Sequence, residues 1–414
     1  MQMKIKAIFS LAILAILGVF ALVLTSGGAL AFDFSTGGTS ASDVSFENMK
    51  FVKNVMIWFM LMLVAFLMLF IKKYEWGVAL AVLLSAAGSF IVYLAIHDFV
   101  IGDTWNQDLM LMAVICAITV VIAIGCFLGN IKMWQYFVVG ILFAPAFVII
   151  EWFMFGFAGS NVSTDALLAS LFGYGASDAG GSMLVHMFAA YFGVGVAIAI
   201  REKRAFDEPM YTTTHSVSFV WLASMLLWVL WPSFVTALLP AEQVFWGMMC
   251  CYMAGIGSIV SAWIVCTAIQ KKVNPLIYTY AMLAGPVAIG TPLIMVGPWA
   301  AIVVGIIAGA ISALSFIYLH PVFCKKIGAL DVMGVHNLHG VAGWLGAFVG
   351  VIALAYNATI EEAFTNLLAA VGVFIITLVL GMLVGLLIRA TRGSFQDDKM
   401  FSDDADFIKN DAPA

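Results

Sequence analysis

The amino-acid sequence predicts an all-α, polytopic membrane protein, and three observations support this prediction. Hydrophobic residues make up 64% of the 414 residues and charged residues only 10%. A water-soluble fold cannot enclose that much apolar surface behind so few charges. Apolar runs close to the roughly 20 residues that a spanning helix requires recur along the chain, and most lysines and arginines lie in alternate connections between these runs.

Eleven apolar runs are long enough to be interpreted as transmembrane helices. They are expected near residues 52–71, 76–96, 109–128, 135–156, 181–200, 214–239, 244–269, 276–295, 298–319, 333–356 and 365–388. No soluble domain stands out between them, so residues 32–389 are predicted to form one transmembrane domain. Residues 390–414 are rich in aspartate and are expected to be a solvated cytoplasmic tail.

The first 31 residues are expected to be a cleaved secretory signal peptide. Lys4 and Lys6 precede the apolar stretch 7–24, and Ala29-Leu30-Ala31 places small residues at cleavage spacing. The alternative is a retained extra helix. N-terminal sequencing of the mature protein distinguishes the two.

The distribution of basic residues predicts the orientation in a cell (inner or cytoplasmic) membrane. If the mature N-terminus lies outside, most lysines and arginines fall on the inner side, and only Lys50 and Lys53 lie outside. Lysine and arginine are retained in the cytoplasm during insertion, so this arrangement is the expected one, with the C-terminus in the cytoplasm.

Two histidines stand out within the predicted spans, because an imidazole deep in a lipid-spanning helix indicates a function. His186 lies in the fifth span and His336 in the tenth; each follows an aspartate, Asp178 or Asp331, and precedes a glycine by seven residues. If spans 1–5 and 6–10 form two repeats, the two histidines lie at equivalent positions. Each repeat has an odd number of helices, so the two repeats are inverted in the membrane, and the eleventh helix lies outside them. Inverted repeats with a site near the midplane are a common transporter plan. We therefore expect both imidazoles to meet in one site.

Two neutral imidazoles suit a small polar molecule. Each offers one N–H donor and one acceptor nitrogen, whereas no acid lies at mid-depth to offset the desolvation of an ion. The alternative for each histidine is a structural hydrogen bond to a neighbouring helix. This alternative is favoured for His339, three residues after His336, although His339 is also a secondary candidate for the site.

A haem- or metal-binding protein is a competing class of function. His336 and His339 form a His-x-x-His pair to which His186 and an acidic residue can add ligands. No Cys-x-x-Cys-His motif accompanies them. We therefore expect no cofactor, no metal and no enzymatic activity, and an absorption spectrum with metal analysis tests this.

Several longer motifs resemble the ammonium transporter/Rhesus glycoprotein family, and its Rhesus branch in particular. They are Asp178-Ala-Gly-Gly-Ser-Met-Leu-Val-His186, Trp228-Val-Leu-Trp231-Pro-Ser-Phe234, Leu283-Ala-Gly-Pro-Val-Ala-Ile-Gly-Thr291 and Asp331-Val-Met-Gly-Val-His336-Asn-Leu-His339-Gly340. With the eleven spans, the resemblance covers essentially the whole mature chain.

The resemblance implies a homotrimer in which each subunit holds a narrow, largely apolar pore for ammonia. It implies that His186 and His336 are the twin histidines at mid-depth, and that Asp178 shapes the recruitment region without touching the substrate. Glu151 resembles the vestibule acid of the Rhesus branch, and Phe234 the inner of two stacked phenylalanines at the external mouth.

The chain departs from the family pattern at the mouth of the predicted pore. Ile115 stands at the place of the outer phenylalanine, so the gate has one aromatic ring. Leu238 replaces a serine that helps to bind the cation in the other branch, which predicts weaker recruitment.

The function expected from these residues and this resemblance is ammonia conduction after deprotonation of ammonium at the outer mouth. Methylammonium and carbon dioxide are further candidate substrates, and no nucleic-acid partner is expected. A membrane sensor is a different class of function, but the short tail after Arg389 carries no recognisable signalling domain.

Overall fold

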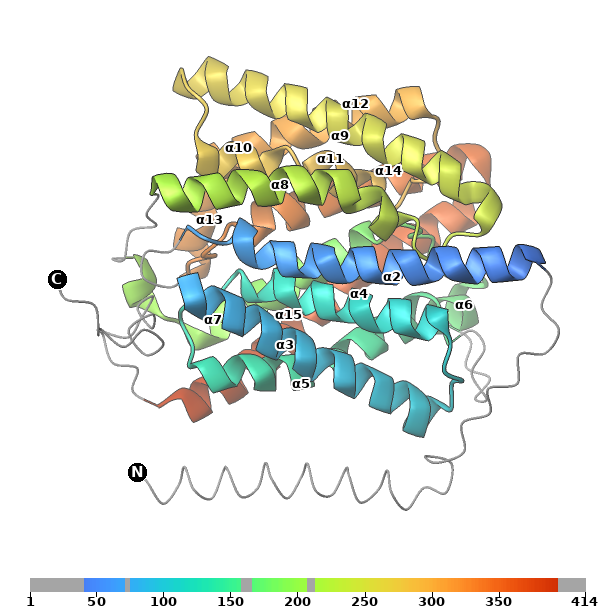
Figure 1. Cartoon of the computed structure of the whole chain (residues 1–414), viewed down its shortest axis with the longest axis horizontal. Helices are drawn as coiled ribbons and strands as arrows, with labels where there is room; N and C mark the ends of the chain where they lie inside the picture. Colours follow the sequence, from blue (N-terminus) through green and yellow to red (C-terminus); the bar gives the residue numbers. More distant parts are fainter. Residues whose placement is uncertain (1–40, 71–74, 158–165, 207–212, 394–414) are drawn as a thin grey trace. The chain divides into compact units, whose positions relative to one another are not determined.

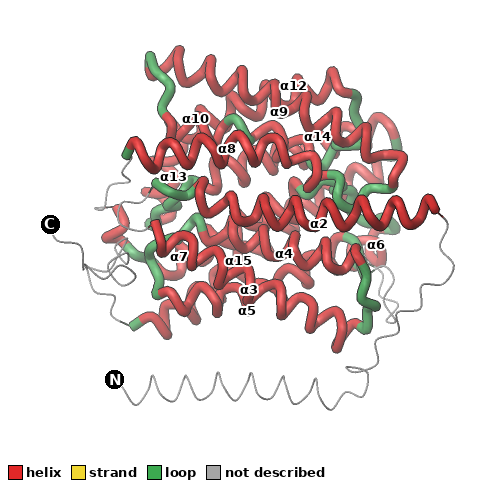
Figure 2. Tube along the Cα trace, in the orientation of Figure 1, coloured by secondary structure: helices red, strands yellow, loops and turns green. Residues whose placement is uncertain are grey.

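The computed structural model describes residues 41–70, 75–157, 166–206 and 213–393, and residues 48–414 form one compact unit. The predicted signal peptide lies outside the described residues, as does most of the predicted tail. Within the described part of the chain the regular structure is entirely helical. The long helices of this unit run side by side along a common direction, with loops at their ends (Figure 1, Figure 2).

The helices follow one another along the chain, and short segments of π or 3-10 winding adjoin several of them. The α-helices are α2 (Ala41–Leu67), α3 (Glu75–Ile96), α4 (Gln107–Ile124), α5 (Met133–Met154), α6 (Leu167–Phe172), α7 (Phe188–Ile200), α8 (Thr214–Val235), α9 (Ala241–Gln270), α10 (Pro275–Ala281), α11 (Ala284–Ile289), α12 (Pro298–Leu314), α13 (His320–Ile327), α14 (Val341–Asn357) and α15 (Ile360–Arg392). The other segments are η1 (His97–Ile101), η2 (Ser182–Met187), η3 (Lys203–Phe206), η4 (Ser315–Leu319) and η5 (His336–Gly340).

Ten helical stretches among the described residues are long and apolar enough to cross a membrane. They correspond to ten of the eleven predicted runs. The remaining run, 276–295, forms two shorter helices, α10 and α11. Pro286 has no N–H with which to bond the carbonyl of Met282 four residues earlier, and this carbonyl instead accepts a hydrogen bond from Ser258 Oγ at 2.6 Å.

Glycines allow pairs of helices to pack with their backbones in contact. A Cβ atom on Gly381 of α15 would lie 2.1 Å from the carbonyl oxygen of Phe192 in α7, and one on Gly305 of α12 would lie 1.9 Å from that of Ala254 in α9. No side chain fits at such distances. The close approach is typical of membrane helices, where van der Waals packing between backbones holds the bundle together.

The two ends of the bundle differ in charge. We call the end with α6 the acidic end and the end with α13 the basic end; they lie at the right and left of Figure 1. The acidic end carries Asp103, Asp108, Glu151, Asp178, Glu361 and Glu362 against Lys50 and Lys53, and the basic end carries Lys203, Arg204, Lys325, Lys326, Arg389 and Arg392 against Glu202 and Asp331.

Glu202 joins three segments at the basic end. Its Oε2 accepts hydrogen bonds from Arg204 at 2.7 Å and from Arg392 at 3.0 Å. Arg392, the last residue of α15, also donates to the carbonyl oxygen of Asn130 at 2.7 Å. Hydrogen bonding from Arg204, with the charge of both arginines, lowers the pKa of Glu202 to about 2. The cluster fixes the ends of α7 and α15 to the connection before α5.

Replacing Glu202 with glutamine is expected to lower the thermal unfolding midpoint at pH 7, by about 1 °C for each kcal/mol lost in a chain of 414 residues. The folded pKa lies below the ordinary value of 4.5, so the carboxylate contributes stability that is complete above pH 4.5 and is lost as the pH falls toward 2. Intrinsic fluorescence of both proteins in detergent measures the difference, which should shrink on acidification. A difference independent of pH contradicts this role.

Candidate functional site

A cavity of about 430 Å³ lies at the acidic end, and we call it the vestibule. The four predicted mouth residues, Ile115, Glu151, Asp178 and Phe234, all line it, and so does Leu238. They come from α4, α5, the segment before η2, and the end of α8. The structure therefore brings together residues that are up to 123 positions apart in the sequence.

Asp178 holds the local backbone at the base of the vestibule. Its Oδ2 accepts hydrogen bonds from the backbone N–H groups of Met183 at 3.0 Å and Leu184 at 2.8 Å, and its Oδ1 accepts from the hydroxyl of Thr291 at 2.5 Å. Burial raises the pKa of this carboxyl to about 6, and the three hydrogen bonds oppose the shift. These contacts are those of a helix cap that also ties η2 to the segment after α11.

Asp331 makes the same kind of cap at the basic end. Its carboxylate accepts hydrogen bonds from the backbone N–H groups of Val335 at 3.0 Å and His336 at 2.8 Å. Three residues after each aspartate a glycine has a positive φ, +80° at Gly181 and +67° at Gly334. The two caps therefore share the aspartate–glycine spacing and the positive φ, although the bonded N–H groups lie five and six residues after Asp178 and four and five residues after Asp331.

His186 and His339 face each other from η2 and η5. Their Nδ1 atoms are 3.1 Å apart, and the rings are stacked with centroids 5.1 Å apart and an angle of 22° between their planes. Both side chains are buried. Both lie in π-helical turns, which are frequent at functional sites.

The expectation that His336 meets His186 is therefore corrected. The ring of His336 stacks on Phe323 with centroids 4.2 Å apart and approaches the edge of Tyr191. The physical reason is depth: Asp331 caps the helix at His336, which places that residue in the first turn. His339 lies one turn further into the bundle and faces η2.

The spacing of the two caps carried a signal that the sequence analysis did not use. His186 lies eight residues after Asp178, and His339 lies eight residues after Asp331, whereas His336 lies only five. Equal distance from equivalent caps puts equivalent residues at equal depth. The sequence favoured a structural hydrogen bond for His339. In the structure His339 occupies the place opposite His186 that was expected for His336.

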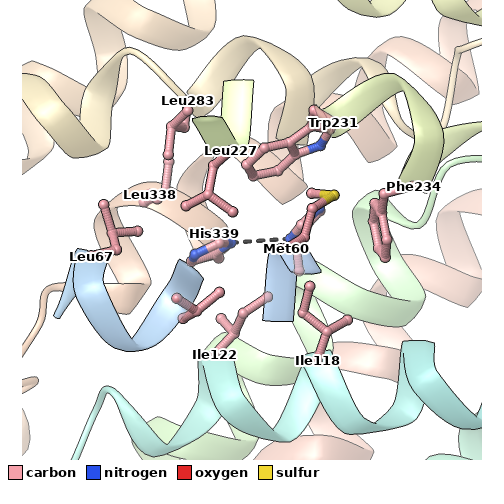
Figure 3. A pocket seen from close by; sticks show the side chains of 12 residues that line it. Met60, Leu67, Ile118, Ile122, Leu227, Trp231, Phe234, Leu283, Leu338 and His339 are labelled. Carbon is pink, nitrogen blue, oxygen red and sulfur yellow. Dashed lines mark hydrogen bonds between the residues drawn. The ribbon is translucent and has the colours of Figure 1, made fainter. Parts of the chain in front are cut away.

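A second, smaller cavity of about 30 Å³ lies beside the histidine pair. A molecule the size of water needs about 10–15 Å³ of such space. Apart from the two imidazoles its lining is apolar or aromatic, and Phe234 and Leu67 lie at opposite ends of it (Figure 3). The lining residues other than the histidines are Met60, Val64, Leu67, Ile118, Ile122, Leu227, Trp231, Phe234, Leu283 and Leu338.

Phe234 belongs to the linings of both the vestibule and the small cavity. Its ring centroid lies 5.9 Å from that of His186, and the Trp231 ring stacks on His186 at 5.7 Å. His186 Nε2 and Trp231 Nε1 are buried and have no hydrogen-bond partner among the described residues. A guest in the small cavity would meet polar atoms that the protein leaves unpaired.

No group of three histidine, cysteine, aspartate or glutamate side chains among the described residues is arranged to hold a metal ion. His336 and His339, the proposed His-x-x-His pair, turn toward different partners, Phe323 and His186.

Residues 17–406 match the Ammonium Transporter Family over nearly the whole chain. The chain belongs to this family. The ammonium transporter Rh type A of Bos taurus is 31% identical over 340 residues, which cover 78% of this chain and 75% of the relative. This agrees with the Rhesus-like motifs of the sequence.

Solved structures share the fold. Rh50 of Nitrosomonas europaea, described as one of the Rhesus protein family of channels, superposes with a TM-score of 0.80 at 29% identity and covers 90% of this chain and 94% of that one. Mep2 of Candida albicans superposes with a TM-score of 0.70 at 17% identity, over 85% and 86% of the two chains. This member of the ammonium transporter family is a multi-pass membrane transporter and not an enzyme.

Proposed function

We propose that this protein conducts ammonia after ammonium has lost a proton in the vestibule. The observation that carries the proposal is the His186–His339 pair, which lies in an apolar cavity separated by Phe234 from an acidic vestibule. Ile115 replaces an aromatic residue at the mouth, and among the aromatic residues that line the two cavities Phe234 is the one common to both, so it acts as the gate. Asp178 supports this region by capping η2.

The vestibule suits the charged ammonium ion, and the small cavity suits neutral ammonia. Ammonium, like an alkylamine that titrates near ~10.4, is mostly protonated at neutral pH. The carboxylate of Glu151 attracts this cation into the vestibule. The apolar lining beyond Phe234 penalises a bare charge heavily. The neutral molecule is therefore the species that enters.

The geometry of the histidine pair supports a neutral guest. One Nδ1 must donate to the other across 3.1 Å, so one ring carries its proton on Nδ1 and the other on Nε2. One Nε2 is then an acceptor and the other a donor. Ammonia, which has both N–H groups and a lone pair, can use both atoms. Ammonium, which has only donors, can use one.

The proposal includes the setting of the protein. The acidic end faces the outside and the basic end the cytoplasm of the cell membrane, as retention of positive charge on the inner side predicts. Ammonia regains a proton from water at the basic end. The resemblance to the family supports a homotrimer with one pore in each subunit.

Stopped-flow pH recording on proteoliposomes tests the function. An imposed ammonium gradient should produce a pH change faster than in empty vesicles, and methylammonium a slower one because the small cavity is narrow. A carbon dioxide gradient in the same vesicles tests the other small neutral substrate, to which the apolar lining presents no charge barrier. Permeability equal to that of empty vesicles in every case refutes conduction.

Replacing Leu238 with serine is expected to strengthen recruitment. Leu238 lines the vestibule and is 43% exposed, so a hydroxyl there meets the arriving cation without being buried. One added hydrogen bond of about 0.5–1.5 kcal/mol lowers the half-saturating ammonium concentration roughly two- to tenfold. Concentration series on proteoliposomes measure it, and Leu238→Ala is the matched control. An equal change in both variants contradicts the role of the hydroxyl.

A further inference from the structure

We infer that His97, held between Glu151 and Asp103, carries the proton that ammonium loses in the vestibule out to the surface of the acidic end. The inference rests on the proposed ammonia conduction, which requires a path for that proton. His97 lies near a span end, where the sequence suggested an interfacial residue. In the structure its side chain is almost fully buried, with 2% of the residue exposed.

The local backbone brings Asp103 onto the ring of His97. The carbonyl of His97 accepts hydrogen bonds from the N–H groups of Gly102 at 2.8 Å and Asp103 at 2.9 Å. This reversal requires the positive φ of +84° at Gly102. It places the Asp103 carboxylate 2.7 Å from His97 Nδ1. The imidazole therefore carries a proton on Nδ1, which it donates to Asp103.

Glu151 lies on the other side of the ring. Its Oε2 accepts a hydrogen bond from the hydroxyl of Tyr93 at 2.9 Å and lies 3.6 Å from His97 Nε2. The rings of Tyr93 and His97 stack with centroids 4.2 Å apart. His97 Nε2 is buried and has no hydrogen-bond partner within the described residues. The Nε2 lone pair thus lies near a carboxylate oxygen that can become protonated.

Glu151 connects two cavities. It lines the vestibule, and with His97 and Asp103 it also lines a separate cavity of about 130 Å³, which we call the side cavity. Thr104 and Asn106, which are exposed, border the side cavity. A proton that reaches Asp103 is therefore close to solvent at the acidic end, outside the path of ammonia.

The proton transfers balance along this path. One N–H bond of ammonium breaks, its electron pair stays on nitrogen to give ammonia, and the proton goes to the Glu151 carboxylate. Glu151 passes a proton to His97 Nε2, and the imidazolium releases its other proton from Nδ1 to Asp103 and then to water. The ring is then protonated on Nε2, and its reorientation restores the starting tautomer before the next proton arrives. Histidine suits this task because its two nitrogens exchange proton and lone pair.

The charges around His97 favour a transient imidazolium. Carboxylates lie beside both ring nitrogens. Asp108, which also lines the side cavity, is paired with Lys50 at 2.8 Å. The titratable groups packed around the ring and its partners are Tyr93, Asp103, Asp108, Cys116 and Glu151. The net negative charge offsets part of the desolvation of a protonated ring.

The test compares ammonia flux at two external pH values in proteoliposomes that contain wild type or His97→Gln. Glutamine still donates to Asp103 but cannot relay a proton. Taking ~10.4 as the ammonium pKa, the neutral fraction is roughly 300-fold larger at pH 9 than at pH 6.5. We expect flux at pH 6.5 to fall at least roughly tenfold in the variant, and flux at pH 9 to stay within about twofold of wild type.

Two further variants make the outcome specific. Asp103→Asn removes the proton acceptor and should reproduce the same dependence on pH, whereas His215→Gln, at the exposed start of α8, should leave flux unchanged at both values. An equal loss at pH 6.5 and 9, or no loss at either, overturns the relay. A wild-type protein that conducts nothing above empty vesicles refutes the proposed function instead, so the two failures are distinguishable.

Discussion

Ammonia permeability is expected to fall by roughly 10- to 100-fold when His186 and His339 are both replaced by leucine. Leucine fills a similar volume but removes the polar atoms that the pair presents to the small cavity. A polar guest left without partners in an apolar site loses about 1–3 kcal/mol, and each 1.4 kcal/mol is a factor of ten. Stopped-flow pH recording on proteoliposomes with matched protein content measures the change.

His336→Phe is the control that distinguishes the two possible pairs. Phenylalanine preserves the stacking on Phe323 and the contact with Tyr191, so permeability should stay close to that of wild type. A loss confined to His336→Phe, with normal flux in the double leucine variant, contradicts the assignment of His339. Equal thermal unfolding midpoints show that the variants are folded.

Asp178→Ala is expected to destabilise the protein by at least about 3 kcal/mol, because two buried N–H groups and a hydroxyl lose their acceptor at roughly 1–3 kcal/mol each. The affected donors are Met183, Leu184 and Thr291. We therefore expect a lower thermal midpoint and a smaller folded fraction on size-exclusion chromatography. Asp178→Asn keeps one acceptor oxygen and should lose less.

Asp331→Ala is the matched variant at the other end of the bundle, since its carboxylate caps η5 in the same way. We expect a similar loss of stability. Asp108→Ala is the control, because this acid is half exposed and pairs with Lys50 at the surface, where an ion pair contributes little. If Asp178→Asn instead raises the half-saturating ammonium concentration with an unchanged thermal midpoint, Asp178 recruits substrate directly.

The spans were predictable because lipid imposes a simple requirement. A helix that crosses a bilayer must be apolar over roughly 20 residues, and ten of the eleven predicted runs are long apolar helices in the structure. The run 276–295 failed as a continuous helix, since a proline removes one backbone donor and Ser258 on α9 takes up the freed carbonyl. Hydropathy carries no information about such a partner.

The mouth residues were predictable only through their resemblance to a family. Ile115, Glu151 and Phe234 lie on separate helices and Asp178 lies in the segment before η2, so their meeting in one cavity depends on how those elements pack. His97 illustrates the opposite case. Its position between Asp103 and Glu151 depends on a tight turn at Gly102 and on the neighbouring α5, neither of which hydropathy reveals.

The sequence by itself determined that the chain is a helical membrane protein with histidines deep in its spans, because composition and run length suffice for both conclusions. The eight-residue spacing from each aspartate indicates which histidine meets His186, but the tertiary structure decided it. His336 and His339 are three residues apart, and the choice depends on the cap at Asp331 and on the turn of η5 that follows it. The cap and the turn set how deep each histidine lies in the bundle and which way its side chain points, and both features belong to the folded backbone.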